Sequence, residues 1–307
     1  MKKRDVTIVG GGIAGLTTAF FAARENLITT LIDNQGASGG VLINVESIQN
    51  FPGFPDGVSG YELGPTIANQ AVASGAEFMF GSVTEIRQSA SAWELFGDFD
   101  TVLTSNLVVA TGSQPKRLSI SKEEELYGHG ISYCATCDGD FFRDEDVVIA
   151  GGGDAALDEA LVLAEIVKSA TIIHHGDSPT GSKATLDRVQ KLGNVRLLAN
   201  SEVIKLLGDD ALSGVSIRNE RGSIDELKCT GLFVYVGSEP QTHLLQDFCE
   251  LDASGHVAVN RQMATSVTGL YAVGDIRQRS SGLLLGSAAD GMAAARAIAA
   301  KIRASSD

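Results

Sequence analysis

The chain is short of basic residues and of long apolar runs. It has 24 Lys and Arg against 38 Asp and Glu, which gives a formal net charge of −14. Because binding to a phosphate backbone needs a clustered basic face, we expect no nucleic acid as a partner. The charge also disfavours an anionic protein partner unless a local basic patch is exposed. No apolar run reaches membrane-spanning length, so we expect no membrane contact.

Cysteine is scarce as well, with 4 residues in a chain of 307. Cys229 and Cys249 stand alone, so a zinc site lacks the second close pair of ligands that it needs, and we expect no metal. A stabilising disulfide is typical of an oxidising compartment. The charged start of this chain leads into a short strand and not into an apolar stretch of signal length, so we expect a cytoplasmic protein.

The other two cysteines, Cys134 and Cys137, are separated by only two residues. Such a pair can close a very small disulfide ring that is readily reduced. Asp138 follows immediately and can exchange a proton with a departing thiolate. We interpret these three residues as a catalytic group for disulfide chemistry and not as a structural staple.

The N-terminal segment has the pattern of a complete βαβ unit that binds a dinucleotide. We expect a buried strand, a glycine turn, a helix and a second strand at 6–9, 10–15, up to about 26, and 27–33. Gly10 makes the tight turn, Gly12 lets the backbone approach a pyrophosphate, and Gly15 allows the helix to pack closely on the strand. Asp33 ends the second strand, where a carboxylate can accept hydrogen bonds from ribose hydroxyls.

A second unit of this kind lies in the middle of the chain. Its strand, glycine turn, helix and second strand are expected at 146–150, 151–156, up to about 168, and 170–174. The second strand ends in His174-His175-Gly176, with neither the cationic residues that select NADPH nor the acid that selects NADH. The turn at Gly151–Gly153 therefore either binds another nucleotide or a flavin, or binds no ligand and only retains a fold inherited from an ancestor. We favour the inherited fold.

The third glycine signal is Gly274-Asp275, where a carboxylate follows a short strand. An Ala-rich helix expected at 285–302 then packs tightly, through small residues, against whatever Asp275 contacts. Two glycine turns predict two lobes. We expect an α/β fold of two nucleotide-binding Rossmann-like domains, with the second (116–242) inserted in the first (1–115 and 243–307).

Seven motifs, in order along the chain, resemble those of the low-molecular-weight thioredoxin reductases. They are 10–15, 50–54, 109–112, 132–139, 151–154, 235–237 and 271–275. The resemblance implies a flavin-dependent disulfide oxidoreductase that forms a homodimer and acts on a thioredoxin-like protein or a small disulfide or dithiol. It implies that Cys137 faces the flavin, that Cys134 exchanges with the partner, and that Asp138 supplies the proton.

The resemblance also implies a site for FAD. The pyrophosphate would lie on the first glycine turn, the adenosine ribose on Asp33 and the ribityl chain on Asp275. The residues that we expect to bind FAD are Gly10, Gly12, Ile13, Ala14, Gly15, Asp33, Gly40, Asn50, Ala110, Thr111, Gly112, Gly274 and Asp275.

The chain departs from this family's pattern in two regions. Members that use NADPH carry His-Arg-Arg and a further Arg, where this chain has His174-His175-Gly176 and Thr180-Gly181. The flavin surroundings differ too, since the usual Gly-Gly-Gln, threonine-rich and Arg-Gln segments are replaced by Gly39-Gly40-Val41, 43–46 and 280–284. These departures resemble the pyridine-nucleotide-independent branches, which are ferredoxin-linked or diflavin-linked.

We therefore expect electron exchange between FAD, the cysteine pair and its partner without NADPH. The alternatives are a conventional NADPH thioredoxin reductase and an oxygen-dependent dithiol oxidase. A ferredoxin is a candidate donor, but it is typically acidic, and only Arg277 and Arg279 near the flavin aspartate offer a basic patch.

Overall fold

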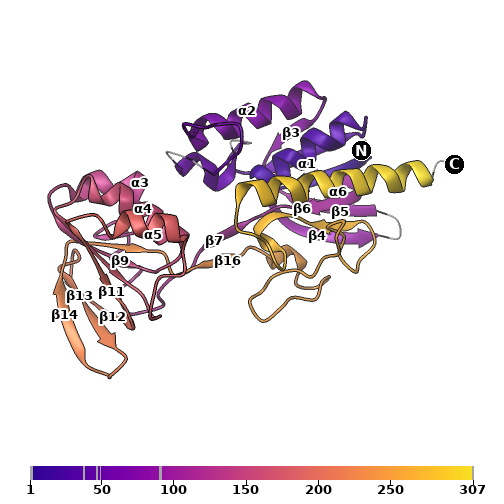
Figure 1. Cartoon of the computed structure of the whole chain (residues 1–307). Coiled ribbons are helices and arrows are strands. Elements are labelled where there is room, and N and C mark those ends of the chain that lie inside the picture. The colour runs from indigo at the N-terminus through magenta and orange to yellow at the C-terminus, as the bar shows by residue number, and fades with distance from the viewer. Residues whose placement is uncertain (1–2, 37–38, 46–47, 49, 90–91, 306–307) are drawn as a thin grey trace. The chain divides into compact units, whose positions relative to one another are not determined.

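The computed structural model describes residues 3–36, 39–45, 48, 50–89 and 92–305. The contacts divide the chain into unit 1, residues 1–114 and 239–307, and unit 2, residues 115–238 (Figure 1). The sequence placed the second boundary four residues later, after residue 242. Residue 241 belongs to unit 1 because the Gln241 N–H donates to the Gly112 carbonyl at 2.9 Å. Strands β7 (Ser113–Pro115) and β16 (Ser238–Pro240) pair where the chain passes between the units.

Unit 1 contains a seven-stranded sheet in the order β3-β2-β1-β6-β5-β4, with β17 also paired to β6. Strands β1, β2, β3, β6 and β17 run parallel to their neighbours, whereas β4 and β5 form an antiparallel ribbon against β6. The strands are β1 (Arg4–Val9), β2 (Thr29–Asp33), β3 (Glu77–Phe80), β4 (Val83–Ser89), β5 (Ala92–Gly97), β6 (Val102–Val109) and β17 (Leu270–Ala272). The central strands are mostly buried on both faces, as a covered parallel sheet requires.

The main helices of unit 1 are α1 (Ile13–Arg24), α2 (Gly60–Ala73) and α6 (Leu284–Ala304). Short 3-10 turns η1 (Gly40–Asn44), η3 (His243–Leu245) and η4 (Gly274–Ile276) join them to the strands. Helix α6 packs closely on α1, because a Cβ at Gly291 would lie 2.4 Å from the Ala14 carbonyl oxygen. This contact is the close packing that the small residues of the expected C-terminal helix predicted.

Unit 2 contains a five-stranded parallel sheet in the order β11-β10-β9-β15-β8. Its strands are β8 (Ile131–Ser132), β9 (Asp146–Ala150), β10 (Ser169–Ile173), β11 (Val195–Leu198) and β15 (Gly231–Val234). A separate antiparallel sheet, which was not predicted from the sequence, is formed by β12 (Ser201–Leu207), β13 (Gly214–Asn219) and β14 (Ile224–Lys228). Together these elements bear out the α/β class and the two Rossmann-like domains.

The helices of unit 2 are α3 (Ala135–Asp138), η2 (Gly139–Phe142), α4 (Asp154–Ala164) and α5 (Lys183–Val189). Helix α4 ends four residues before the expected end at Lys168. The Asn194 amide donates to the carbonyls of Ala164 and Val167, at 2.9 and 3.3 Å, so the chain turns out of the helix there. This partner is 30 residues away in the sequence, and the helical periodicity does not reveal it.

Candidate functional site

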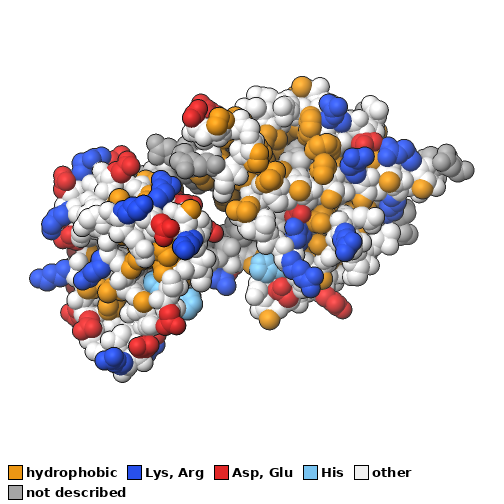
Figure 2. All heavy atoms as spheres, viewed as in Figure 1, with side chains coloured by type: hydrophobic (Ala, Val, Ile, Leu, Met, Phe, Trp, Pro, Cys, Tyr) orange, Lys and Arg blue, Asp and Glu red, His pale blue; other side chains and the backbone are white. Residues whose placement is uncertain are grey.

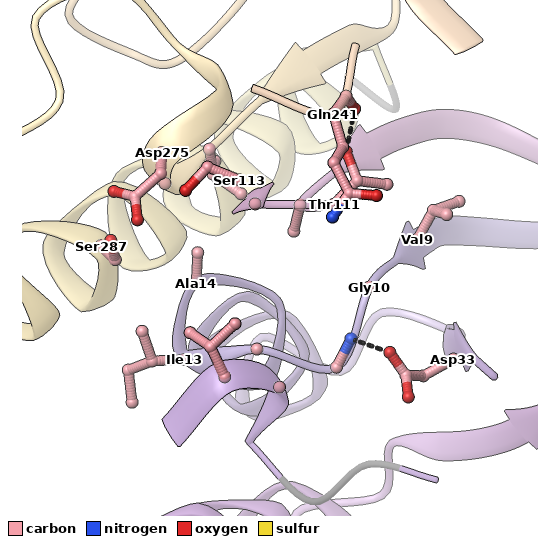
Figure 3. A pocket seen from close by; sticks show the side chains of 18 of the residues that line it. Val9, Gly10, Ile13, Ala14, Asp33, Thr111, Ser113, Gln241, Asp275 and Ser287 are labelled. Carbon is pink, nitrogen blue, oxygen red and sulfur yellow. Dashed lines mark hydrogen bonds between the residues drawn. The ribbon is translucent and has the colours of Figure 1, made fainter. Parts of the chain in front are cut away.

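Unit 1 contains a cavity of about 540 Å³, a size typical of cofactor sites. The glycine turn after β1, Asp33 and Asp275 line this cavity (Figure 3). The cavity lies at the carboxyl ends of the parallel strands, where ligands bind in open α/β sheets. The segments that line it are 9–14, 32–35, 39–42, 81–83, 110–113, 241, 243–244, 273–275, 282–284 and 287.

The glycine turn after β1 leaves its backbone open toward this cavity. Gly10 has φ +109°, and a Cβ there would lie 2.4 Å from the Ala110 carbonyl oxygen, so only glycine fits. A Cβ at Gly12 would meet no atom closer than 4.0 Å, so the backbone beside it is accessible. Because α1 begins at Ile13, its free N–H groups and its dipole favour an anion such as a pyrophosphate here.

Asp33 at the end of β2 is held in one orientation by two backbone groups. The Gly11 N–H donates to Oδ2 at 2.6 Å (Figure 3). The Gln35 N–H donates to Oδ1 at 2.8 Å. Each carboxylate oxygen keeps further acceptor capacity toward the cavity. The arrangement therefore suits the hydroxyls of a ribose.

A second carboxylate, Asp275, lines the cavity on the same side as Ser113 and Ser287 (Figure 3). The Ser280 hydroxyl donates to Asp275 Oδ1 at 2.8 Å. Ser280 belongs to the segment that replaces the family's Arg-Gln, so this segment supports the carboxylate. With one carboxylate near each end and a helix N-terminus between them, the residues present fit FAD.

Most residues expected to bind FAD line this cavity, and two do not. Gly15 supports the turn from behind, because a Cβ there would lie 1.9 Å from the Gly10 carbonyl oxygen. Asn50 is exposed and is not among the lining residues. Glu46, one of the departures from the family pattern, lies outside the described residues. The sequence missed Gln241, whose carbonyl accepts the Thr111 hydroxyl at 2.6 Å, because no motif marks it.

In unit 2, Cys134 and Cys137 form a disulfide, with Cα atoms 5.3 Å apart. The Cys137 N–H donates to Cys134 Sγ at 3.1 Å, so the first turn of α3 closes over this sulfur. The Ala135 N–H donates to the Tyr235 hydroxyl at 2.9 Å, and burial raises the pKa of that hydroxyl. Asp138 accepts a hydrogen bond from Ser132 at 2.6 Å. The structure thus brings the three expected catalytic residues together within one turn.

The other two cysteines lie apart from this group. Cys229 is buried, and burial raises its pKa to about 12, so its thiol is protonated near neutral pH. Burial also raises the pKa of Cys249. Among the described residues, no group of three or more His, Cys, Asp or Glu is placed to hold a metal ion.

The second glycine turn repeats the geometry of the first with different side chains. A Cβ at Gly11 would meet Asp33 Cγ at 2.9 Å, and a Cβ at Gly152 would meet His174 Cβ at 2.9 Å. The His174 imidazole therefore lies where unit 1 has the Asp33 carboxylate. Burial and the neighbouring His175 lower the pKa of His174, so its ring is neutral at pH 7.

The loop after this strand offers no cation for a 2′-phosphate. His175 and Thr180 are exposed, and residues 174–182 contain neither Arg nor Lys. The N–H groups of Thr180 and Gly181 both donate to the Gly152 carbonyl, at 2.7 and 3.1 Å. The fold of the turn is therefore retained, whereas the charged part of an NADPH site is absent from this loop.

The structure corrects the expectation of a basic patch at Arg277 and Arg279. The Arg277 side chain is only 14% exposed, and it is paired with Asp290. Its Nη1 donates to the carbonyls of Gln278 and Arg279, at 3.0 Å each. Of these two arginines, only Arg279 is exposed and able to contact an acidic protein. The Arg277 guanidinium is paired with Asp290 of α6.

Among the described residues, no helix combines the length and the apolar character that crossing a membrane requires.

Known proteins resemble this chain both in sequence and in structure. Residues 4–296 match the family model described as pyridine nucleotide-disulphide oxidoreductase. The chain is 37% identical to thioredoxin reductase from Treponema pallidum (strain Nichols) over 97% of each chain. It is 32% identical to a 34.2 kDa protein in the rubredoxin operon of Clostridium pasteurianum over 96% of each. The solved thioredoxin reductase of Lactococcus lactis superposes with a TM-score of 0.93 at 33% identity, covering 96% of this chain and 97% of that one.

Proposed function

This chain belongs to the pyridine nucleotide-disulphide oxidoreductase family, and on that premise we propose that it is a thioredoxin-reductase-like enzyme that does not rely on NADPH. It is a flavin-dependent oxidoreductase with two Rossmann-like domains. Electrons move between FAD, the Cys134–Cys137 disulfide and a thioredoxin-like or small disulfide or dithiol partner. The observation that carries the donor proposal is the loop after β10, in which residues 174–182 contain neither Arg nor Lys; rapid reduction by NADPH would instead place the phosphate contacts at Lys183 or Arg188.

FAD is assigned to the cavity of unit 1. The first glycine turn and the N-terminus of α1 hold its pyrophosphate, Asp33 its adenosine ribose and Asp275 its ribityl chain. When bound, FAD supplies the two-electron chemistry that reduces or reoxidises a disulfide. The protein contributes the binding and the orientation of the cofactor.

The cysteine pair exchanges with the partner by thiol–disulfide chemistry. In the reductive direction, the Cys134 thiol passes its proton to Asp138 and its sulfur attacks one sulfur of the partner disulfide, while the electron pair of the broken S–S bond leaves on the other sulfur. Asp138 gives that sulfur a proton. The Cys137 thiolate then attacks Cys134 Sγ, which restores the Cys134–Cys137 disulfide and releases the partner as a dithiol.

The absence of Arg and Lys from residues 174–182 argues against NADPH as the donor. In sites that select NADPH, Arg residues bind the 2′-phosphate through charge-assisted hydrogen bonds, each worth roughly 1.5 to 3 kcal/mol. Losing two or three of these hydrogen bonds lowers the preference for NADPH over NADH by several orders of magnitude. His174 does not replace them, since burial lowers its pKa and keeps it uncharged.

The sequence leaves two other candidate functions open, and one of them has support among the relatives. The relatives named thioredoxin reductase, such as that of Treponema pallidum, favour a conventional NADPH enzyme. The relative encoded in a rubredoxin operon agrees instead with a redox protein as the donor. An oxygen-dependent dithiol oxidase uses the same two centres with the electron flow reversed.

A homodimer in the cytosol completes the proposal. Large apolar side chains are exposed on α2 and α6, and Figure 2 shows hydrophobic side chains gathered on this face of unit 1. They include Tyr61, at 76% exposure, and Leu285, at 52%. An apolar face of this kind suits burial against a second copy. A ferredoxin donor keeps only Arg279 as a basic contact near Asp275, so we rank it below a dithiol.

The decisive experiment is anaerobic reduction of the flavin, followed by its visible absorbance. NADPH, NADH, reduced ferredoxin and dithiothreitol are tested in parallel on the holoprotein. The proposal expects slow bleaching with both pyridine nucleotides, with little preference between them, and rapid bleaching with dithiol or ferredoxin. Rapid stoichiometric bleaching by micromolar NADPH would return the protein to the conventional enzymes. Bleaching by dithiol that reverses in air, with no turnover of oxidised thioredoxin, would identify the oxidase.

A further inference from the structure

Ser132 lies directly beneath the redox disulfide and is almost completely buried. It ends β8, where it pairs with Phe233 of β15, and it is 2% exposed. Its hydroxyl is therefore fixed by a strand of the parallel sheet and not by a loop. A buried hydroxyl needs hydrogen-bond partners, and those of Ser132 belong to the catalytic group.

The Ser132 hydroxyl connects Asp138 to Cys134. It donates to Asp138 Oδ2 at 2.6 Å, and it accepts from the Cys134 N–H at 3.0 Å. The Cys134 carbonyl lies 3.2 Å from the same hydroxyl and also accepts from the Asp138 N–H at 3.1 Å. One buried oxygen thus orients the carboxylate relative to the backbone of the exchanging cysteine.

We propose that Ser132 is a positioning residue for proton transfer at the disulfide. This proposal rests on the proposed function, since it concerns the exchange step of Cys134. In that step the Cys134 thiol passes its proton to the Asp138 carboxylate, and the sulfur lone pair forms the bond to the partner sulfur. The partner S–S bond breaks, its electron pair leaves on the second partner sulfur, and Asp138 returns the proton to that sulfur. Ser132 acts by holding Asp138 Oδ2 in place throughout.

The argument for Ser132 is one of geometry. A short hydrogen bond from a neutral hydroxyl to a carboxylate is charge-assisted and directional. Without it, the Asp138 carboxylate is free to rotate into solvent, because Asp138 is the last residue of a helix of only four residues. A general acid or base has to lie within hydrogen-bond reach of the proton that it transfers, so rotation removes its contribution.

The test uses the holoprotein reduced with dithiothreitol, freed of reductant under anaerobic conditions and mixed with excess oxidised thioredoxin. The first-order rate of disulfide exchange and its dependence on thioredoxin concentration are measured by stopped flow from pH 6 to 9. For Ser132→Ala we expect the limiting rate to fall about 10- to 100-fold, with half-saturation unchanged and a changed pH profile. Ser132→Thr, which keeps the hydroxyl, should recover most of the rate.

A double-mutant cycle with Asp138→Asn separates positioning from a structural effect. If Ser132 acts through Asp138, then Ser132→Ala should slow the Asp138→Asn variant by less than about twofold. Ser216→Ala is the matched control, because Ser216 is also buried in unit 2, at 4% exposure. Its rate should equal that of the wild type. Far-ultraviolet circular dichroism and the melting temperature establish that each variant is folded.

Two results would overturn the proposal. One is a wild-type rate and pH profile for folded Ser132→Ala. The other is a full multiplicative loss in the double variant, which would show that Ser132 acts independently of Asp138. Because the protein is reduced beforehand, the exchange rate does not depend on the electron donor. Rapid reduction of the flavin by NADPH would therefore contradict the proposed donor and leave the role of Ser132 unchanged.

Discussion

The Arg277 guanidinium binds the Asp290 carboxylate through two hydrogen bonds, Nε to Oδ2 at 2.5 Å and Nη2 to Oδ1 at 2.7 Å. Both side chains are largely buried, with exposures of 14% and 6%. Asp290 Oδ2 also accepts from the Gly274 N–H at 3.1 Å. The pair therefore fastens the turn that carries Asp275 to helix α6. It connects the cofactor cavity with the C-terminal helix.

Asp290→Asn should lower both the stability of the protein and its affinity for FAD. The substitution leaves the Arg277 charge buried without a negative partner, which typically costs about 3 to 5 kcal/mol. Guanidinium denaturation measures the loss, and fluorescence of released FAD reports the affinity. Arg303→Gln is the control, because it breaks the ion pair with Glu25 at the surface and should change neither quantity appreciably. Equal denaturation midpoints for Asp290→Asn and wild type would contradict the assigned role.

Asp33→Ala should weaken FAD binding. The substitution removes the acceptor that faces the ribose and also leaves the Gly11 N–H without its 2.6 Å partner. Asp5→Ala is a matched control, because the Asp5 carboxylate binds the Ile28 N–H at 2.8 Å at the opposite end of the same two strands. Reconstitution of apoprotein with FAD, followed by flavin fluorescence, should show weaker binding for Asp33→Ala alone. Equal FAD affinity in both variants would remove Asp33 from the site.

The double variant His175→Arg, Gly176→Arg should raise the rate of flavin reduction by NADPH selectively over NADH. A side chain fits at Gly176, because a Cβ there would lie 3.4 Å from the Ser178 carbonyl oxygen, an ordinary contact distance. Two arginines would restore charge-assisted bonds to a 2′-phosphate. Gln190→Arg with Gly193→Arg adds the same charge before β11, at the other end of the sheet, and should have no effect. An equal gain with NADH would indicate a general charge effect and contradict a restored clamp.

Alkylation should separate the redox pair from the other cysteines. Because burial raises the pKa of Cys229 to about 12, its thiol stays protonated and unreactive at pH 8, whereas reduced Cys134 and Cys137 should react with iodoacetamide. Mass spectrometry of the native protein, with and without dithiothreitol, measures the labelled sites. Cys229→Ala should leave disulfide exchange unchanged, and labelling of Cys229 at the rate of the redox pair would show that it is accessible.

The sequence predicted the parts of the molecule that depend on local pattern. The glycine turns at Gly10 and Gly151 lie between strand and helix as expected, since apolar periodicity and φ-permissive residues are read within one short segment. The Cys134–Cys137 disulfide is equally local. The antiparallel sheet of unit 2 was not predicted, because its strands carry no motif that the sequence analysis followed.

The partners of individual side chains were decided by the tertiary structure. The sequence offered Arg277 as a free cation, but folding places the carboxylate of Asp290 against it. The sequence likewise proposed Asp138 as a proton donor without showing its hydrogen bond to Ser132. A motif determines which chemical group is present and near which turn it lies. Which hydrogen bonds that group makes depends on helices and strands that meet only when the core packs, and this packing sets the charge and the orientation that the site presents.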